Sequence, residues 1–520
     1  MTVKALVKTS QYYDSVSLML VARELSKLDG VDDAAVVMAT EANKSILAVA
    51  GLLTEDVSSA SANDLVIAVS ADDSESADAA LQTAEGLLQA KVAPAGNGGY
   101  RPKTIRGALS SHPDANVAVI SVAGRYAADE AWQALIRGLH VLLFSDNVSL
   151  ADEIALKQYA REHSLLMMGP GAGTALLNGA ALGFANAVPS GPVGIVSAAG
   201  TGLQEVSTLL ARLGVGITQG LGTGGRDLKR EVGGIMMLAA IQALQQDPAT
   251  QVIVLVSKPP SDEVAAAILE QAALSDKPTV VCFMGADTQT RAQLSARTLQ
   301  EAAWLAAHAS AADIGTVDSL LASGNAHLLE QAKQLKTRLQ PEQRYLRGLF
   351  SGGTLCYEAQ VVWRDMLSDP VHSNAPLSGG LVLPDSSHSQ AHTAVDLGEE
   401  EFTIGRPHPM IDNDLRVRRL LQEARDPQVG VIMLDVVLGY GAHPDPASEL
   451  VPAIQTALNQ AQGAGRDLII IANVTGTEAD PQVRSQQVAA LERAGVIVCE
   501  SNAAAARLVG LIFEHQEGHQ

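Results

Sequence analysis

The sequence predicts an α/β protein built from several doubly wound domains of flavodoxin or Rossmann type, with a small α/β domain at the N-terminus. Two observations predict this fold class. Short, continuously apolar runs alternate with longer segments of helical periodicity, an order typical of parallel βαβ units. Aromatic residues make up only 3% of the chain and glycine numbers 45, a composition that lets helices pack closely on parallel sheets.

At 520 residues the chain is long enough for three or four domains. We expect domains over residues 1–95, 103–188, 189–310 and 345–516. The clearest linker is 91–102, because it is rich in Gly, Pro and Ala and has no periodicity. Residues 309–343 are predicted to form a helical connector. The Pro-, Ser- and Gly-rich stretch 369–394 is predicted to be a long loop whose histidines are solvated.

The first domain is predicted to alternate three strands with three helices. The strands cover 3–8, 34–38 and 64–69, and the helices cover 14–28, 41–53 and 74–89. In the first helix Leu18, Val21 and Leu25 recur at helical spacing and form one apolar face. Either Asp14 or Ser15 can cap its N-terminus.

The second domain shows the alternation most clearly. Its strands are predicted at 117–122, 140–144 and 165–168, and its helices at 127–137 and 150–162. A short polar or Gly-rich loop follows each strand. Because the carboxyl ends of parallel strands meet at one edge, where open α/β sheets bind ligands, these loops are candidates for a binding site.

The third and fourth domains repeat this pattern. Their strands are predicted at 193–197, 216–220, 251–256, 279–283, 347–350, 431–434, 468–471 and 496–499. Lys258 follows one of these strands in the segment SKPP. It either faces a ligand at the carboxyl edge or is a surface lysine before a proline turn.

Glycine-rich turns lead from predicted strands into helix-like segments. We expect the rest of the chain to be arranged around the turn within 191–206. The turns contain Gly200, Thr201, Gly202, Gly224, Gly225, Gly352, Gly353 and Thr354. Such turns direct backbone N–H groups and the helix dipole at the sheet edge, where an anion fits. We therefore predict that these residues bind a phosphate or acyl phosphate. The alternative is that glycine serves only the backbone freedom of the turn.

Two histidines lie in proline-stiffened loops, His408 in GRPHPMID and His443 in GYGAHPD. Histidine most readily transfers a proton near neutral pH, and the flanking prolines would hold His408 in place. We predict His408 as an acid/base; the alternative for both is a histidine that caps backbone groups. No HxH, HExxH or GxxxxGK[ST] spacing occurs, and no GxGxxG follows the first strand of a dinucleotide fold. We therefore expect no metal, P-loop or nicotinamide site.

The net charge limits the kinds of binding partner that we expect, and the cysteines indicate the cellular compartment. The net charge of −21, without a run of Lys or Arg, argues against nucleic acid or an anionic membrane as partner. Cys282, Cys356 and Cys499 are far apart and form no CxxC pair, which fits a reducing cytoplasm. The start MTVKALVKTS has no leader pattern, and no run of about 18 apolar residues occurs. We expect a soluble, cytoplasmic protein.

Several motifs together resemble the FdrA family of acyl-CoA-synthetase-like proteins. They are DSVSLML, NVAVISVAG, LFSDNVSLADEIALK, LLMMGP, GTGGRDL, SKPP, GGTLCYEA, GRPHPMID and SQQ. More distantly, residues 110–305 resemble the α subunit of succinyl-CoA synthetase, and 345–515 the carboxyl-terminal ligase domain of its β subunit. The resemblance implies a CoA-binding-like Rossmann domain at 103–188 and ligase-like flavodoxin domains at 189–310 and 345–516.

The resemblance also bears on the site. GIVSAAGTGLQEV is similar to the ligase segment whose glycine-rich turn binds phosphate and whose glutamate, here Glu205, steadies a phosphorylated histidine. That histidine has no counterpart, because the chain reads MGADTQ at 284–289. The ATP-grasp domain and the glycine-rich loop of the ligase CoA site are not recognisable either. Gly171 and Ala172 stand where the relatives have Asn or Asp followed by Cys, so only the backbone N–H groups of that loop are expected to serve a ligand.

These features predict a subunit of a carbamoyl or acyl transferase that uses an acyl phosphate. Family resemblance implies carbamoyl phosphate, in an oxamate-type carbamoyltransferase of purine and allantoin catabolism. Glu205 would orient a ligand or water, Arg226 would hold the phosphate, and His408 would be the acid/base. Other enzyme subunits and further copies of the chain are the expected partners, and CoA is a possible ligand. The alternatives are an ADP-forming acyl-CoA synthetase whose nucleotide domain comes from another chain, and a non-catalytic scaffold subunit.

Overall fold

The structure, a computed structural model, forms two compact units. The first comprises Met1–Ser111 and Glu400–His408, and the second comprises His112–Glu399 and Pro409–Gln520. The structure describes the chain apart from residues 1, 10, 12, 14–17, 19–20, 23, 26, 41–42, 45–46, 49, 93–101, 123, 287–293, 404–406 and 515–520. Most of the predicted linker and the capping candidates Asp14 and Ser15 lie outside the described residues, as do parts of the first two predicted helices.

The first unit contains an antiparallel sheet in the order β1-β3-β2. Its elements are β1 (Thr2–Lys8), β2 (Val31–Met38), α3 (Glu55–Ser59), β3 (Leu65–Ala71), α4 (Ser74–Val92), α5 (Ile105–Ser111) and α14 (Glu400–Thr403). The central strand β3 is apolar on both faces. Ile67 packs in a cluster with Leu88 of α4, and Val66 packs in a second cluster with Val57 of α3. Burial on both faces explains why this strand takes the centre.

The second unit begins with a small parallel sheet in the order β4-β5-β6. Its elements are β4 (Val117–Ile120), α6 (Gly124–Leu135), β5 (His140–Leu143), α7 (Leu150–Glu162) and β6 (Met167–Met168). The predicted parallel βαβ arrangement is confirmed here. Ser149 caps α7 by accepting the N–H of Asp152, which explains the start of that helix.

A seven-stranded sheet follows in the order β13-β12-β11-β9-β10-β7-β8. Its strands are β7 (Thr174–Leu177), β8 (Ala180–Gly183), β9 (Ser190–Ser197), β10 (Ile217–Gly222), β11 (Val252–Ser257), β12 (Thr279–Phe283) and β13 (Leu294–Ser295). The helices are α8 (Gly200–Arg212), η1 (Gly225–Leu228), α9 (Ile235–Gln246), α10 (Asp262–Ala272) and α11 (Leu299–Ala309). The sheet is parallel from β13 to β10, whereas the hairpin β7–β8, which the sequence patterns did not reveal, adds antiparallel strands at one edge.

The last sheet is parallel throughout, in the order β16-β15-β17-β14-β18-β19-β20. Its strands are β14 (Tyr345–Phe350), β15 (Val371–Ser373), β16 (Leu381–Val382), β17 (His392–Asp396), β18 (Val429–Val437), β19 (Ile469–Thr475) and β20 (Ile497–Cys499). The helices are α13 (Gly353–Met366), α15 (Asp414–Glu423), α16 (Pro446–Gly463), α17 (Arg484–Arg493) and α18 (Asn502–Phe513). The predicted connector 309–343 contains α12 (Val317–Lys336).

The prediction of a long loop over 369–394 is wrong, because β15, β16 and the start of β17 lie there. These strands are short and separated by Pro, Ser and Gly, so they show no period of two. Two of the three histidines in this stretch also differ from the prediction. His392 is buried against Tyr345 and Phe513, and burial lowers its pKa to about 4, while His372 is half-buried. His388 is exposed, as predicted.

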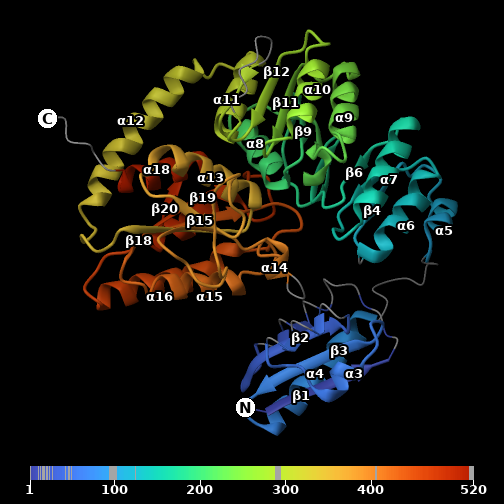
Figure 1. The fold of residues 1–520 in the computed structure, drawn as a ribbon, viewed down its shortest axis with the longest axis vertical. Coiled ribbons are helices and arrows are strands. Elements are labelled where there is room, and N and C mark those ends of the chain that lie inside the picture. The colour runs from blue at the N-terminus through green and yellow to red at the C-terminus, as the bar shows by residue number, and fades with distance from the viewer. Residues whose placement is uncertain are drawn as a thin grey trace. The chain divides into compact units, whose positions relative to one another are not determined.

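One hydrophobic cluster joins the two seven-stranded sheets. It includes buried residues of α8, α11, α13 and α18, and α8 contacts both α11 and α13 (Figure 1). The helices α9 and α10 cover the opposite face of the first of these sheets through a second cluster. The helices α8 and α13 therefore pack into one continuous core. Among the described residues, no helix combines the length and apolarity that crossing a bilayer requires.

Candidate functional site

The turn after β9 places the amino end of α8 at the carboxyl edge of the sheet. Ala199 is the N-cap residue, and its N–H donates to Oγ of Ser197 at 3.0 Å. Within the described part of the chain, no side chain caps this helix, and the N–H groups of Gly200, Thr201 and Gly202 have no acceptor. These three amides are therefore available to a ligand.

The turn after β14 places the amino end of α13 in the same way, with one difference. Asp435 accepts the N–H groups of Ser351 at 2.7 Å and Gly352 at 2.8 Å. The Gly352 amide, which the sequence analysis assigned to phosphate, is therefore already satisfied. The amides of Gly353 and Thr354 have no acceptor among the described residues.

The two helix ends touch, and glycine makes this possible. A β-carbon added at Gly352 would lie 2.8 Å from Cγ2 of Thr201, and one added at Gly202 would lie 2.9 Å from Cγ2 of Thr354. Thr201 is 9% exposed and Thr354 is 5% exposed. We call residues 199–202 and 352–354 the paired helix ends. Two turns that are far apart in the sequence thus form one site.

Adding a methyl group at Gly202 should weaken this contact. Gly202→Ala is expected to lower the free energy of unfolding by about 1–3 kcal/mol through overpacking, although alanine favours a helix. The shift of the urea unfolding midpoint measures it, with Gly324→Ala in α12 as control, because nothing lies within 4 Å of a β-carbon there. The control should be slightly stabilising. Thr354→Ser, which removes the clashing methyl group, should restore part of the loss; a harmless Gly202→Ala would contradict the close contact.

The third predicted turn lies beside the first. The N–H of Thr223 donates to the carbonyl of Ser197 at 2.8 Å. Gly224 has a φ of +82°, and a β-carbon there would collide with the carbonyl oxygen of Pro170, so glycine is required at this position. Gly225 lies near Ala198, where a β-carbon would be 3.7 Å from the carbonyl oxygen.

The loop 169–174 borders both turns, but its amides serve the protein. The N–H of Gly171 donates to the carbonyl of Ser145 at 3.0 Å, and that of Ala172 donates to the carbonyl of Leu143 at 3.3 Å. The expectation that these two N–H groups serve a ligand is therefore corrected: they hold the loop against β5.

Arg226 is engaged on α7. Its Nε lies 2.8 Å from Oε2 of Glu153, and its guanidinium donates to the carbonyl of Val148 at 2.8 Å. The side chain is 35% exposed. These contacts favour a role in holding α7 against the turn after β10, and the predicted contact with phosphate stays a prediction.

Glu205 and Glu358 each accept the N–H of the first residue of a helix that belongs with the other seven-stranded sheet. Glu205, from α8, accepts the Thr475 hydroxyl at 2.5 Å and the N–H of Asn502, the first residue of α18, at 3.0 Å. Glu358, from α13, accepts the N–H of Leu299, the first residue of α11, at 2.6 Å and the Asn502 amide at 2.7 Å. These two contacts link the helices of the first seven-stranded sheet with those of the second.

The sequence predicted that Glu205 orients a ligand or water, whereas its contacts in the structure are with the protein. Both carboxylate oxygens are engaged by protein donors, so a role toward a ligand stays a prediction. Sequence reasoning missed Glu358, although Gly-Thr followed by glutamate recurs in GTGLQE and GTLCYE. Burial, with a smaller contribution from the charge of Glu205, raises the pKa of Glu358 to about 7.

The two predicted histidines lie in different surroundings. His408 is half-buried and belongs to the segment 400–408, which groups with the first unit, so its role as acid/base stays a prediction. Gly405 and Arg406 lie outside the described residues. His443 is buried, with Nε2 3.1 Å from Glu449 and Nδ1 accepting the N–H of Asp445 at 3.1 Å. That geometry matches a histidine that caps backbone groups.

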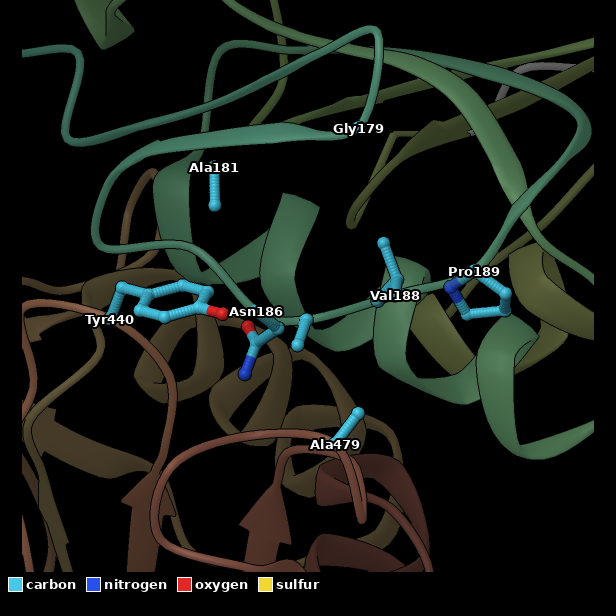
Figure 2. Close-up of a pocket in the computed structure, with 8 residues that line it drawn as sticks. Gly179, Ala181, Asn186, Val188, Pro189, Tyr440 and Ala479 are labelled. Atoms are coloured by element: carbon cyan, nitrogen blue, oxygen red, sulfur yellow. The ribbon is translucent and has the colours of Figure 1, made fainter.

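A cavity of about 470 Å³ lies elsewhere in the second unit (Figure 2). Small and apolar side chains such as Ala181, Val188 and Ala479 line it, together with Tyr440 and Asn186. The Asn186 amide donates to the carbonyl of Leu438 and to Asp480, and its oxygen accepts from Gln204. Because its buried polar group is fully used, this cavity offers less chemistry than the paired helix ends.

Three family models match parts of the chain. One, described as AllF, heavy metal-associated domain, matches residues 1–103; the CoA binding domain matches 190–285; and the CoA-ligase matches 349–512. The chain is also 46% identical over 507 residues to the uncharacterized protein YahF of Escherichia coli (strain K12), covering 96% of this chain and 97% of that protein. The chain belongs to the FdrA-type family that includes YahF. The resemblance predicted from the motifs is confirmed.

Part of the chain is also similar to the α subunits of CoA ligases. The chain is 26% identical over 185 residues to the α subunit of the ADP-forming succinate–CoA ligase of Methanothermobacter thermautotrophicus, covering 34% of this chain and 60% of that subunit. It is 27% identical over 152 residues to the α subunit of malate–CoA ligase of Methylorubrum extorquens, covering 28% of this chain and 50% of that subunit. The FdrA-type chain is therefore acyl-CoA-synthetase-like, and its predicted domain boundaries stay predictions.

Two solved structures show weak overall likeness. A dinucleotide-forming acetyl-coenzyme A synthetase 1 of Ca. Korarchaeum cryptofilum, with phosphate and ADP, is 16% identical over 76% of this chain and 82% of that chain, with a TM-score of 0.27. An ATP citrate lyase of Methanothrix soehngenii, with citrate and coenzyme A, is 24% identical over 40% of this chain and 36% of that chain, with a TM-score of 0.31.

Proposed function

We propose that this chain binds an acyl phosphate at the paired helix ends and is a subunit of a transferase that uses carbamoyl phosphate. The observation that carries the proposal is the contact between two glycine–threonine helix ends whose first-turn amides are largely without acceptors among the described residues. Each helix end carries about half a positive charge. Two such ends in contact repel each other, and a phosphate with a charge of about −2 offsets both.

The proposed chemistry depends on positioning of the reactants and on stabilisation of the leaving phosphate. A nitrogen nucleophile attacks the carbamoyl carbon, the carbon–oxygen bond to phosphate breaks, and phosphate leaves as the anion that the amides stabilise. No phosphohistidine carrier is required for this step. The partners would be small-molecule acceptors and other enzyme subunits of the same pathway.

A second candidate function is favoured by the two CoA-related family models. An ADP-forming acyl-CoA synthetase would bind CoA here and take its nucleotide domain from another chain. Its acyl phosphate intermediate would use the same paired helix ends. CoA binding therefore separates the two candidates.

Titration calorimetry of the full chain with carbamoyl phosphate, inorganic phosphate, CoA and ATP-Mg tests the proposal. Gly200→Asp is the informative variant, because an acidic residue suits the first turn of a helix but repels a phosphate there. We expect the affinity of this variant for carbamoyl phosphate to fall about tenfold or more. A tenfold loss corresponds to about 1.4 kcal/mol of binding free energy. Gly200→Asn has the same shape without the charge and should bind much more tightly than Gly200→Asp.

The other outcomes are decisive as well. Binding of CoA without binding of carbamoyl phosphate would favour the synthetase. Equal affinities of the Asp and Asn variants would place the anion away from α8 and contradict the proposed site. A chain that binds none of the four compounds would fit a non-catalytic scaffold.

A further inference from the structure

Asp396, which the sequence analysis did not select, lies at the carboxyl end of β17. Its backbone is tied on both sides to Asn374, whose side chain accepts the N–H and donates to the carbonyl of Asp396, each at 2.9 Å. Oδ1 accepts the N–H of Gly398 at 2.9 Å. The side chain is 2% exposed. The residue is therefore buried and rigidly oriented.

The carboxyl group of Asp396 lies against the amino end of α13. A β-carbon added at Gly353 would collide with Oδ2 of Asp396 and lie 3.4 Å from its Cγ. Oδ2 has no hydrogen-bond partner within the described part of the chain. Only glycine fits at this position, so a carboxyl oxygen of a largely buried side chain, without a partner among the described residues, lies beside the paired helix ends.

A second buried carboxylate at the same helix end provides a contrast. Asp435 accepts two backbone N–H groups and the Ser351 hydroxyl, and it pairs with buried Arg416. Its oxygens are saturated by the protein, whereas Asp396 keeps one oxygen for a further partner. The two carboxylates therefore differ: the protein engages both oxygens of Asp435 but only Oδ1 of Asp396 within the described residues.

Burial and the neighbouring charges bring the pKa of Asp396 close to neutral pH. Burial is the largest cause that raises its pKa to about 7, and the charges of Glu399 and Asp435 add to it. Lys258, exposed after β11, and the N–H of Gly398 oppose the shift. Burial raises the pKa of the Cys356 thiol on α13 well above its ordinary value, and the charge of Asp396 adds to this shift.

We propose that Asp396 is the general base of the acyl-transfer site at the paired helix ends. The inference rests on the proposed function. As the nitrogen nucleophile forms its bond to the carbamoyl carbon, its proton passes to Oδ2 of Asp396, while the electron pair of the breaking carbon–oxygen bond leaves with phosphate. A carboxyl group whose pKa is raised to about 7 is suited to accept and then release this proton near neutral pH.

A purely structural role makes the opposite electrostatic prediction. A carboxylate that only stabilised the dipole of α13 would be favoured in its ionised form, which would lower its pKa. Binding of an anion beside Asp396 would then take up no proton. Proton uptake on anion binding therefore shows only that Asp396 faces the anion. The base role is tested by phosphate release from carbamoyl phosphate with hydroxylamine as the nitrogen nucleophile: the rate should rise with pH as Asp396 ionises and be lost in Asp396→Asn, which keeps anion binding.

The test uses sulfate as probe, because it is a tetrahedral dianion that does not itself titrate near pH 7, together with carbamoyl phosphate. Calorimetry of the full chain near pH 7.5 in two buffers of different ionisation enthalpy gives the protons taken up per anion bound. We expect uptake of a fraction of one proton in the wild-type chain and none in Asp396→Asn, which should still bind the anion. Asp385→Asn, at an exposed carboxyl group in the same unit, is the control and should keep the uptake.

Stability gives a second readout. Because the folded pKa of Asp396 is raised, its contribution to stability is present below about pH 4 and is lost as pH rises to about 7. The wild-type chain should lose stability over this range more steeply than Asp396→Asn. Unchanged proton uptake in Asp396→Asn would overturn the base assignment and leave the proposed function standing, whereas a wild-type chain that binds neither anion would overturn both.

Discussion

Replacing Lys157 by methionine is expected to lower the free energy of unfolding by about 3–5 kcal/mol. Lys157 is fully buried, with Nζ 2.8 Å from Glu153, 2.9 Å from Asp227 and 3.1 Å from the carbonyl of Thr223. Its removal leaves Asp227 without a buried cationic partner, and an uncompensated buried charge is costly. Asp227 also accepts the N–H groups that begin α9, so the loss extends to the turn after β10.

Urea unfolding followed by tryptophan fluorescence measures this loss. All three tryptophans, Trp132, Trp304 and Trp363, lie in the second unit, so the signal reports that unit alone. Arg230→Met removes one partner of an exposed ion pair with Glu263 and should cost less than about 1 kcal/mol. A Lys157→Met variant as stable as this control would refute the buried network.

Replacing Asp435 by alanine is expected to cost a similar 3–5 kcal/mol or so, and in addition to abolish anion binding. The variant leaves the buried N–H groups of Ser351 and Gly352 without an acceptor and Arg416 without its carboxylate. Because these amides set the direction in which α13 begins, the paired helix ends would lose their geometry.

Asp435→Asn is the matched variant, since it keeps one acceptor oxygen and removes only the charge. It should fold with an intermediate loss of stability. Asp414→Ala, at an exposed ion pair with Arg418, is the surface control. Calorimetry with carbamoyl phosphate at a temperature where Asp435→Asn is folded then measures binding. Full affinity in that variant would show that the position of α13 does not depend on the charge of Asp435.

The sequence by itself determined the alternation of strands and helices in the second unit and its parallel sheets. The reason is local: a buried parallel strand needs a continuous apolar run, and a covering helix needs apolar residues at helical spacing. The glycine–threonine turns were also visible, because a helix that follows a strand without a side-chain cap has a recognisable composition. The motifs also predicted the family, because each is a short stretch of sequence that can be recognised without the fold.

Only the tertiary structure decided which of these turns meet and what the charged residues do. The contact of Thr201 with Gly352, the crossed caps of Glu205 and Glu358, and the approach of Asp396 to Gly353 join residues that are distant in sequence and share no periodic pattern. The ion pair between Arg226 and Glu153 likewise joins residues that are distant in sequence. The partner of a charge depends on which surfaces the folded core brings together, and no spacing along the chain encodes that choice.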